Sequence, residues 1–548
     1  MIYEKISRER VNGFLHAVGR TIQNGNNEEI LLTGWGLGNW LNPEGYMWKS
    51  GEVSFSRGRE AEKSIRELAG EEYAQKFWKQ FRANYITKKD IEKMAEFGYN
   101  SVRIPINWRL FMEERPGEII WKDEGFVLLD NCIQWCREYK LYAWIDLHAA
   151  PGGQTGSNID DSEDDLPRLF MNDDYYKKGL ALWRELANRY KDEWIVGGYD
   201  LLNEPIMPND GNTFDQYIPK LKQFYHDAIR EIRKVDAKHM VSLEGQHWAT
   251  TATIFDEPYD ENMVLHFHRY ACLPEQESIQ HFLDCSNRQN IPLWLGETGE
   301  NKIDWYSAYY PMMLSFGIGY NLWTWKKMEN QNSPFSVRKP DGWEQIVSWT
   351  PGSVCPPKEE VWRCLDEYLD NMKLENCDMN EEVVNYAFRR QPSSVRAQDF
   401  EIYDFEETKR PYSGHSDNTS CIYRKEIPIS LKEVSTSQEK AFGFDCLWDR
   451  YVLQLHQDET ASYRFLNLEE DAVLTLYGVI NPSAVLVYQD GRLVKLSVKE
   501  GSGENGQTTG YTLIGNLKSS VESCIVLKAE DVLHIPGLGY DGVRPDRA

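Results

Sequence analysis

The sequence lacks the features that mark several large protein classes. Its 61 Lys and Arg residues are outnumbered by 86 Asp and Glu residues, which gives a formal net charge of −25 and leaves no basic stripe to meet nucleic-acid phosphates. No run of about 18 apolar residues is long enough to span a membrane. The segment Gly36-Leu37-Gly38 lacks the third glycine and the following helix of a dinucleotide-binding loop. We therefore expect no nucleic acid, no membrane and no nucleotide cofactor.

The ten cysteines form no recognisable metal or redox motif. The closest pair, Cys132 and Cys136, is four residues apart and not a CxxC pair. Scattered free thiols are typical of a reducing compartment. Residues 1–11 are charged and contain no apolar stretch of the kind found in secretory signals. We therefore expect a cytoplasmic protein.

Aromatic residues, in contrast, are abundant. The chain has 548 residues with 19 Trp, 30 Tyr and 21 Phe, which is ample for a large core and long enough for a full barrel plus a second unit. Flat rings also stack on the apolar faces of sugars. The Trp content therefore fits a large aromatic core and a sugar-binding cleft equally well.

Strand and helix patterns alternate from Ile30 to about residue 373. Most of the strand-like runs are followed by an amphipathic helix, and there are eight such runs, at residues 30–35, 101–105, 141–148, 198–204, 240–245, 263–268, 291–297 and 318–325. Alternating strands and helices favour a parallel sheet, and eight of them favour a closed barrel. The sequence predicts an α/β fold with a (β/α)8 TIM barrel over residues 1–375.

The pattern changes after residue 375. Short strand-like runs such as Tyr451–Leu455 are separated by turns such as Gln489-Asp490-Gly491. Regular short strands with Gly and Asp turns are typical of a β-sandwich. We predict a C-terminal β-sandwich domain over residues 376–548 that either braces the barrel or binds carbohydrate.

Polar and aromatic side chains stand where the predicted strands end. The apolar run Tyr199–Leu202 leads into Asn203 and Glu204, and Pro205 then stops the strand because proline cannot donate to the ladder. In a (β/α)8 barrel the carboxyl ends of the strands carry the chemistry. The other strand ends supply Arg103, His148, Glu244, His268, Tyr270, Glu297, Trp323 and Trp325.

Two carboxylates at separate strand ends are what glycoside hydrolysis requires, one as an acid and one as a nucleophile or base. Arg103 could keep one of them ionised, because arginine stays protonated. Asn203 could bind a sugar hydroxyl beside the reacting carbon. Tyr270 could donate to a carboxylate, and Trp323 or Trp325 could form the floor of the sugar subsite.

Other readings of these residues remain open. Asp146 with His148, and His266 with His268, share strand faces and could bind zinc in a metal-dependent barrel hydrolase. The protein could also bind glycans without cleaving them, but such a protein would not need the carboxylate pair. Glu244 could also reach the pocket, although a polar residue of the rim is the expected role. An acidic run is expected to form a solvated loop, or alternatively a lid that makes an enzyme exo-acting; it contains Asp160, Asp161, Glu163, Asp164 and Asp165.

The motifs at the strand ends, in this order and spacing, resemble glycoside hydrolase family 5, a family of retaining (β/α)8 enzymes. The resemblance covers about residues 12–370. The matching motifs are Gly36-Leu37-Gly38-Asn39-Trp40-Leu41, Arg103-Ile104-Pro105, Asp146-Leu147-His148, Asn203-Glu204-Pro205, His268-Arg269-Tyr270, Gly296-Glu297 and Trp323-Thr324-Trp325-Lys326.

The resemblance implies a role for each matching residue. Glu204 would be the general acid/base, Glu297 the nucleophile, and Arg103 would lie under the nucleophile. The residues implied around the sugar at the −1 position, where the bond is cut, are His148, Asn203, His268 and Tyr270.

The segment His148–Gln154 is similar to the exo-β-1,3-glucanase and β-glucosidase branch of the family. In that branch an acidic residue stands four places after the Trp that follows the first strand. Glu44 stands four places after Trp40 and is implied to bind a sugar hydroxyl, although its neighbours Pro43 and Gly45 differ from the usual order.

The sequence thus predicts a retaining β-glycosidase that acts on β-glucosides or short β-glucans from one end. It predicts no metal and no other cofactor, and it leaves the oligomeric state open. An endo-acting β-glucanase of the same family is the alternative. A retaining mechanism requires the two carboxyl groups to lie about 5–5.5 Å apart.

Overall fold

A computed structural model of the chain describes residues 2–51 and 53–387, together with short segments between residues 393 and 541. The chain divides into two compact units. The first contains Met1–Tyr270, Ile279–Glu300 and Met313–Val383, and the second contains Ala271–Ser278, Asn301–Met312 and Val384–Ala548. The domain boundary at residue 375 stays a prediction. None of the described helices is long and apolar enough to cross a membrane.

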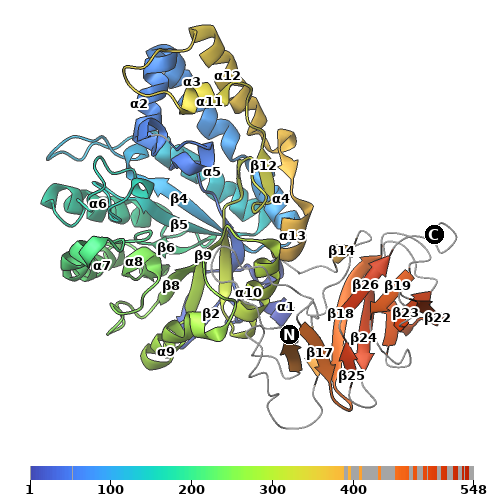
Figure 1. The fold of residues 1–548 in the computed structure, drawn as a ribbon. Helices are drawn as coiled ribbons and strands as arrows, with labels where there is room; N and C mark the ends of the chain where they lie inside the picture. Colours follow the sequence, from blue (N-terminus) through green and yellow to red (C-terminus); the bar gives the residue numbers. More distant parts are fainter. Residues whose placement is uncertain are drawn as a thin grey trace. The chain divides into compact units, whose positions relative to one another are not determined.

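The first unit is built around a closed barrel of eight parallel strands (Figure 1). Around the barrel the order is β10-β3-β4-β5-β6-β7-β8-β9, so the last strand closes on the first. The (β/α)8 prediction is therefore confirmed. The strands are β3 Thr33–Gly36, β4 Ser101–Asn107, β5 Tyr142–Ala149, β6 Val196–Asp200, β7 Met240–Glu244, β8 Met263–Arg269, β9 Leu293–Gly299 and β10 Gly319–Trp323.

Helices alternate with these strands along the chain, as the sequence pattern predicts. They include α2 Gly58–Ala69, α3 Glu71–Tyr85, α4 Lys88–Glu96, α5 Asp123–Tyr139, α6 Asp173–Tyr190, α7 Ile218–Arg233, α9 Gln280–Gln289, α10 Ile303–Ser315 and α12 Lys358–Asn371. The residues near 56–82 are rich in Glu, Lys, Arg and Ala, which predicts one long helix, but Gly70, with a φ of 90°, separates α2 from α3. Helix α4 begins at a capping box formed by Thr87 and Asp90.

The barrel interior is packed with aromatic side chains. Trp144 of β5 lies against Trp294 of β9, with ring centroids 4.9 Å apart. Gly198 of β6 makes room for this pair, because a Cβ atom there would lie 2.5 Å from the Trp144 ring. Every residue of β4 and β5 is buried, as expected for strands covered on both faces. Much of the aromatic content thus serves the core.

The C-terminal segments form strands, as predicted. Described strands include β17 Tyr451–Leu455, β19 Val473–Tyr477, β20 Val485–Gln489 and β24 Glu522–Lys528. They belong to three separate sheets that are antiparallel apart from the pairing of β14 Ser393–Val395 with β18 Thr460–Asn467. Most of the side chains that would show face-to-face packing lie outside the described residues. The β-sandwich therefore stays a prediction.

Candidate active site

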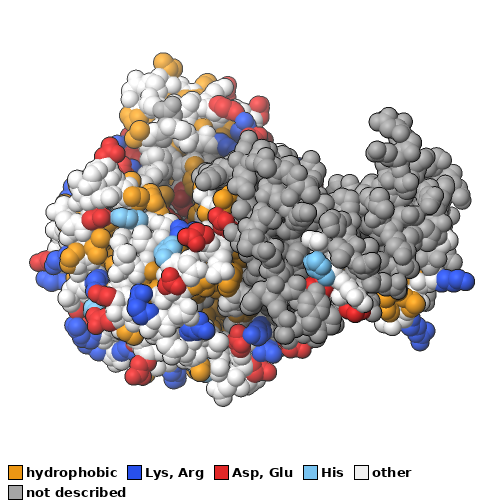
Figure 2. Space-filling view, turned by 60° about the horizontal axis from the view of Figure 1, so that its bottom comes forward, with side chains coloured by type: hydrophobic (Ala, Val, Ile, Leu, Met, Phe, Trp, Pro, Cys, Tyr) orange, Lys and Arg blue, Asp and Glu red, His pale blue; other side chains and the backbone are white. Residues whose placement is uncertain are grey.

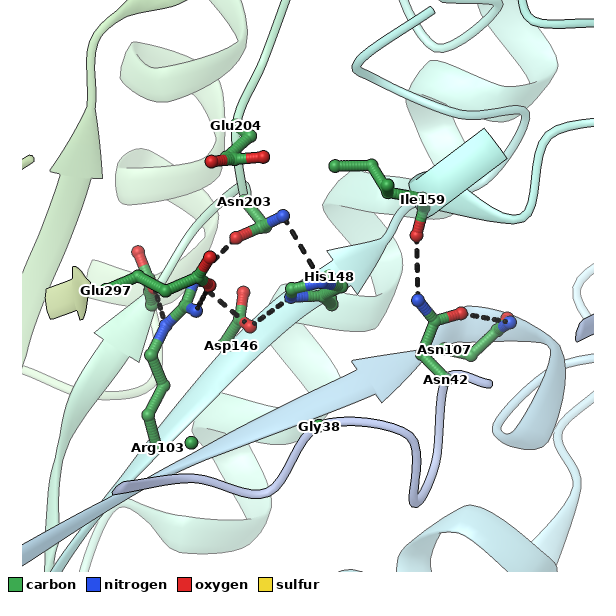
Figure 3. Close-up of polar contacts among 12 residues, drawn as sticks. Gly38, Asn42, Arg103, Asn107, Asp146, His148, Ile159, Asn203, Glu204 and Glu297 are labelled. Carbon is green, nitrogen blue, oxygen red and sulfur yellow. Dashed lines mark hydrogen bonds and ion pairs between the residues drawn. The ribbon is translucent and has the colours of Figure 1, made fainter. Parts of the chain in front are cut away.

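Arg103 is the centre of a buried polar cluster at the carboxyl ends of the barrel strands (Figure 3). Its Nε donates to Asp200 Oδ2 at 2.9 Å, and its Nη1 donates to Glu297 Oε2 at 2.5 Å. Its Nη2 donates to Asn203 Oδ1 at 2.8 Å and lies 3.1 Å from Asp146 Oδ2. A permanent cation thus holds groups from β5, β6 and β9 in fixed positions.

Glu297, on β9, is held as an ionised carboxylate. Its second oxygen accepts a hydrogen bond from the Tyr270 hydroxyl at 2.6 Å. Burial alone would favour the neutral acid, but the charges of His268 and Arg103 outweigh it and hold the pKa of Glu297 well below its ordinary value. An ionised, oriented carboxylate with only 5% of its surface exposed is suited to attack an electrophilic carbon.

Glu204 follows β6 in a different environment. The strand ends at Asp200, two residues earlier than predicted, and Glu204 has a left-handed φ of 44°. Its Oε1 lies 2.7 Å from His268 Nδ1, and its backbone N–H donates to Glu244 Oε2 at 2.7 Å. One oxygen of Glu204 and one of Glu297 lie within 4.8 Å of each other. This separation is closer to the roughly 5–5.5 Å between the carboxyl groups of retaining enzymes than to the roughly 6.5–9.5 Å of inverting ones.

His148 connects the buried carboxyl cluster to Trp323 and Glu44. Its Nδ1 lies 2.8 Å from Asp146 Oδ2, and its ring stacks on Trp323 with centroids 5.2 Å apart and planes within 6°. Burial would lower the pKa of His148, but Asp146 outweighs it and raises that pKa to about 10. Glu44 Oε1 lies 3.6 Å from His148 Nε2. Burial raises the pKa of Glu44 to about 7, and its Oε1 has no hydrogen-bond partner among the described residues.

Trp323 and Trp325, at and just after the end of the last strand, do not share a role. Trp323 ends β10 beside His148, and its indole N–H donates to the Tyr46 hydroxyl at 2.8 Å. Trp325 is fully buried and donates to Asp90 of α4 at 3.0 Å, with Phe335 against its ring. The prediction that Trp325 contacts substrate is therefore wrong, because its ring packs between the barrel and helix α4.

Glu244 is also not the rim residue that the sequence suggests. Its carboxylate is completely buried and accepts from the backbone of Glu204 and from Arg103 Nη2, the latter at 3.2 Å. Burial raises the pKa of Glu244 strongly, against the opposing charge of His268. Only its place at a strand end hinted at this position in the sequence.

The groups that could hold a metal ion are already paired with one another. Glu244, His266 and His268 offer ligand atoms within 4.8 Å, as do Glu204, His268 and Glu297. Burial lowers the pKa of His266 to about 4, so its neutral Nε2 accepts from His268 Nε2 at 3.1 Å. Glu244 and Glu297 already have the Arg103 guanidinium as a counter-cation. This donor set suits a charged hydrogen-bond network better than a metal centre.

The acidic run after β5 is not a solvated loop throughout. Asp160 and Asp161 are buried, and Asp160 accepts from the backbone N–H groups of Thr155 and Ser162 at 2.8 and 3.0 Å. Asp160 is thus held within its own loop, whereas Asp161 accepts from Arg59 and Arg109 of distant segments, which the sequence pattern did not indicate. Over the described part of the face in Figure 2, acidic and basic side chains are interspersed.

An eight-stranded (β/α)8 barrel with paired carboxylates at its strand ends defines a glycoside hydrolase. Residues 61–329 match the family model described as cellulase, glycosyl hydrolase family 5. Residues 61–329, which contain seven of the eight barrel strands, therefore form a glycoside hydrolase family 5 domain.

Three curated proteins illustrate the range of its relatives. A β-xylosidase of Phanerodontia chrysosporium is 29% identical over 260 residues, 47% of this chain and 52% of its own length. Endoglucanase C of Acetivibrio thermocellus is 24% identical over 46% of this chain and 88% of its own length. A glucan 1,3-β-glucosidase of Kluyveromyces lactis is 26% identical over 66% of this chain and 87% of its own length. The match thus spans about half the length of the first of these.

Proposed function

We propose that the protein is a retaining β-glycosidase that releases glucose from the end of β-glucosides or short β-glucans. The observation that carries this proposal is the carboxyl pair. Glu204 and Glu297 have oxygens within 4.8 Å, and of the two only Glu297 accepts hydrogen bonds from Arg103 and Tyr270. Two relatives are named as a β-xylosidase and a glucan 1,3-β-glucosidase, which supports attack at a chain end. The relative named as an endoglucanase keeps endo-action as the alternative.

In this mechanism Glu297 attacks the anomeric carbon while protonated Glu204 donates its proton to the leaving oxygen. The bond between sugar and aglycone breaks, and a covalent bond between the sugar and Glu297 forms. Glu204, now a carboxylate, takes a proton from water, and that water displaces Glu297. His268 contacts Glu204 at 2.7 Å and Glu297 at 3.8 Å, so it can stabilise the charge on either residue.

The test is a panel of 4-nitrophenyl β-glycosides (glucoside, xyloside, mannoside, galactoside and cellobioside), each assayed with and without EDTA. The proposal expects turnover of the glucoside that EDTA leaves unchanged. Activity that EDTA removes and zinc restores would favour the metal-dependent alternative. No turnover with any member of the panel, together with binding of the same sugars, would favour a glycan-binding protein.

We expect Glu244 to position the acid/base residue, because it accepts the backbone N–H of Glu204. In the variant Glu244→Gln, an amide N–H₂ group faces donors that need an acceptor, so we expect Glu204 to shift. A displacement of Glu204 by about 1 Å costs on the order of 10²-fold in kcat. The loss should be larger for aryl glucosides with poor leaving groups, which need proton donation most. Equal losses for good and poor leaving groups, measured on a folded variant, would show a general structural role instead.

A further inference from the structure

One buried carboxylate ties together the segments that follow three consecutive barrel strands. Asp161, after β5, accepts from the backbone N–H of Arg59 at 2.7 Å, a residue that follows β3. It also accepts from Asn107 Nδ2 at 2.8 Å and Arg109 Nη1 at 2.9 Å, at and beyond the end of β4. Strands β3, β4 and β5 are neighbours in the barrel. The carboxylate therefore fastens three adjacent parts of the catalytic rim.

Further contacts close the junction between the segment after β3 and the segment after β5, which we call the seam. Asn42 Nδ2 donates to the carbonyl of Ile159 at 2.8 Å, and Asn107 Nδ2 lies 3.1 Å from Asn42 Oδ1 (Figure 3). Arg57 Nη1 donates to the carbonyl of Ser162 at 2.6 Å. Asn42 and Asp161 are each 2% exposed and Asn107 is 4% exposed. These three side chains are closed to solvent, so the seam is not an open groove where they lie.

The seam lies beside Glu44, which the family resemblance implies to bind a hydroxyl of the glycone, the sugar transferred to Glu297. Glu44 stands two residues after Asn42 in the same segment, and the charge of Glu297 acts on its carboxyl. Its buried Oε1 lies 3.6 Å from His148 Nε2 and has no hydrogen-bond partner among the described residues, so it can accept from a sugar hydroxyl. In the view of Figure 3, Asn42, Asn107 and Ile159 lie beyond His148 as seen from Glu297.

We propose that this clamp, formed by Asn42, Arg59, Asn107, Arg109 and Asp161, closes the glycone side behind one sugar residue. The substrate class is then a glycoside with a single terminal sugar, released as a monosaccharide, because a second glycone sugar would meet the sealed seam. The inference rests on the proposed β-glycosidase function and adds the residues that set its specificity.

The test compares 4-nitrophenyl β-glucoside with 4-nitrophenyl β-cellobioside, with the first product identified by chromatography. The wild-type enzyme should release glucose first from both substrates and no cellobiose. In Asp161→Ala the seam opens, so cellobiose should appear as a first product and the preference for the glucoside should fall at least about 10-fold. The control is Asp164→Asn, in the same loop, whose exposed carboxylate pairs with Arg168 outside the clamp, and it should behave as wild type.

A second variant keeps the test decisive if Asp161→Ala does not fold. Asn42→Ala removes the contacts with Ile159 and Asn107 without leaving an unpaired buried charge, and it should shift the product in the same direction. Cellobiose as the first wild-type product would overturn the clamp proposal and leave the glycosidase function standing. Folded Asp161→Ala and Asn42→Ala proteins that both keep the wild-type preference would also overturn it. A wild-type enzyme that cleaves neither substrate would overturn the proposed function itself.

Discussion

Replacing Glu297 with alanine is expected to lower kcat for 4-nitrophenyl β-glucoside by about 10⁴–10⁶-fold, the scale seen when an enzyme loses its nucleophile. The physical reason is that Arg103, Tyr270 and His268 keep Glu297 charged and aimed. No other described carboxylate combines these three contacts. Kinetics under saturating substrate measure the loss, and circular dichroism checks the fold.

Added azide should restore part of the activity of this variant and reveal the role of the missing group. The small anion can occupy the space left by the carboxylate and attack the anomeric carbon from the same side, which yields an α-glucosyl azide from a β-glucoside. The matched control is Glu300→Gln, a nearby carboxylate that pairs with Lys327 and should keep most of the activity. A Glu297→Ala enzyme within 10-fold of wild type would contradict the assignment.

Replacing Glu204 with alanine is expected to cost an amount that depends on the leaving group. A glucoside with a poor leaving group should lose about 10²–10⁴-fold, the usual contribution of a general acid. A 2,4-dinitrophenyl glucoside needs no proton for departure, so its first step should be nearly unchanged and a burst of dinitrophenol should precede slow turnover. The contact between Glu204 and His268 at 2.7 Å orients the carboxyl group that this variant removes.

Azide again distinguishes the two carboxylates. With Glu204→Ala, azide should attack the covalent intermediate on Glu297 and give a β-glucosyl azide, the opposite anomer from that expected with Glu297→Ala. Identical fractional losses for all leaving groups, with no burst, would mean that Glu204 does not donate the proton.

The barrel was predictable because its signal is local. Each parallel strand is an apolar run ended by polar residues, and β6 and β9 show this pattern clearly in the sequence. The predicted strand ends place Glu204 and Glu297 on one rim without any knowledge of their contacts, whereas Arg103, predicted to end its strand, is the third residue of β4. The pairing within 4.8 Å could not be read from sequence, since it depends on the left-handed turn at Glu204.

The errors arose where long-range contacts overrode the local pattern. Trp323 and Trp325 would share a face if the strand continued, but β10 ends at Trp323 and Trp325 turns towards Asp90. Asp161 reads as part of a polar loop, yet partners from two other segments bury it. Such contacts join residues more than 50 positions apart, and no periodicity in the chain reports them.

The measurement that tests the central claim most directly is the anomer formed first, followed by proton NMR during hydrolysis of a 4-nitrophenyl β-glucoside. Double displacement through Glu297 predicts that β-glucose appears first and converts to the α-anomer only by slow mutarotation. Immediate formation of α-glucose would contradict the account, because it would require a water molecule between Glu204 and Glu297, whose nearest oxygens lie within 4.8 Å.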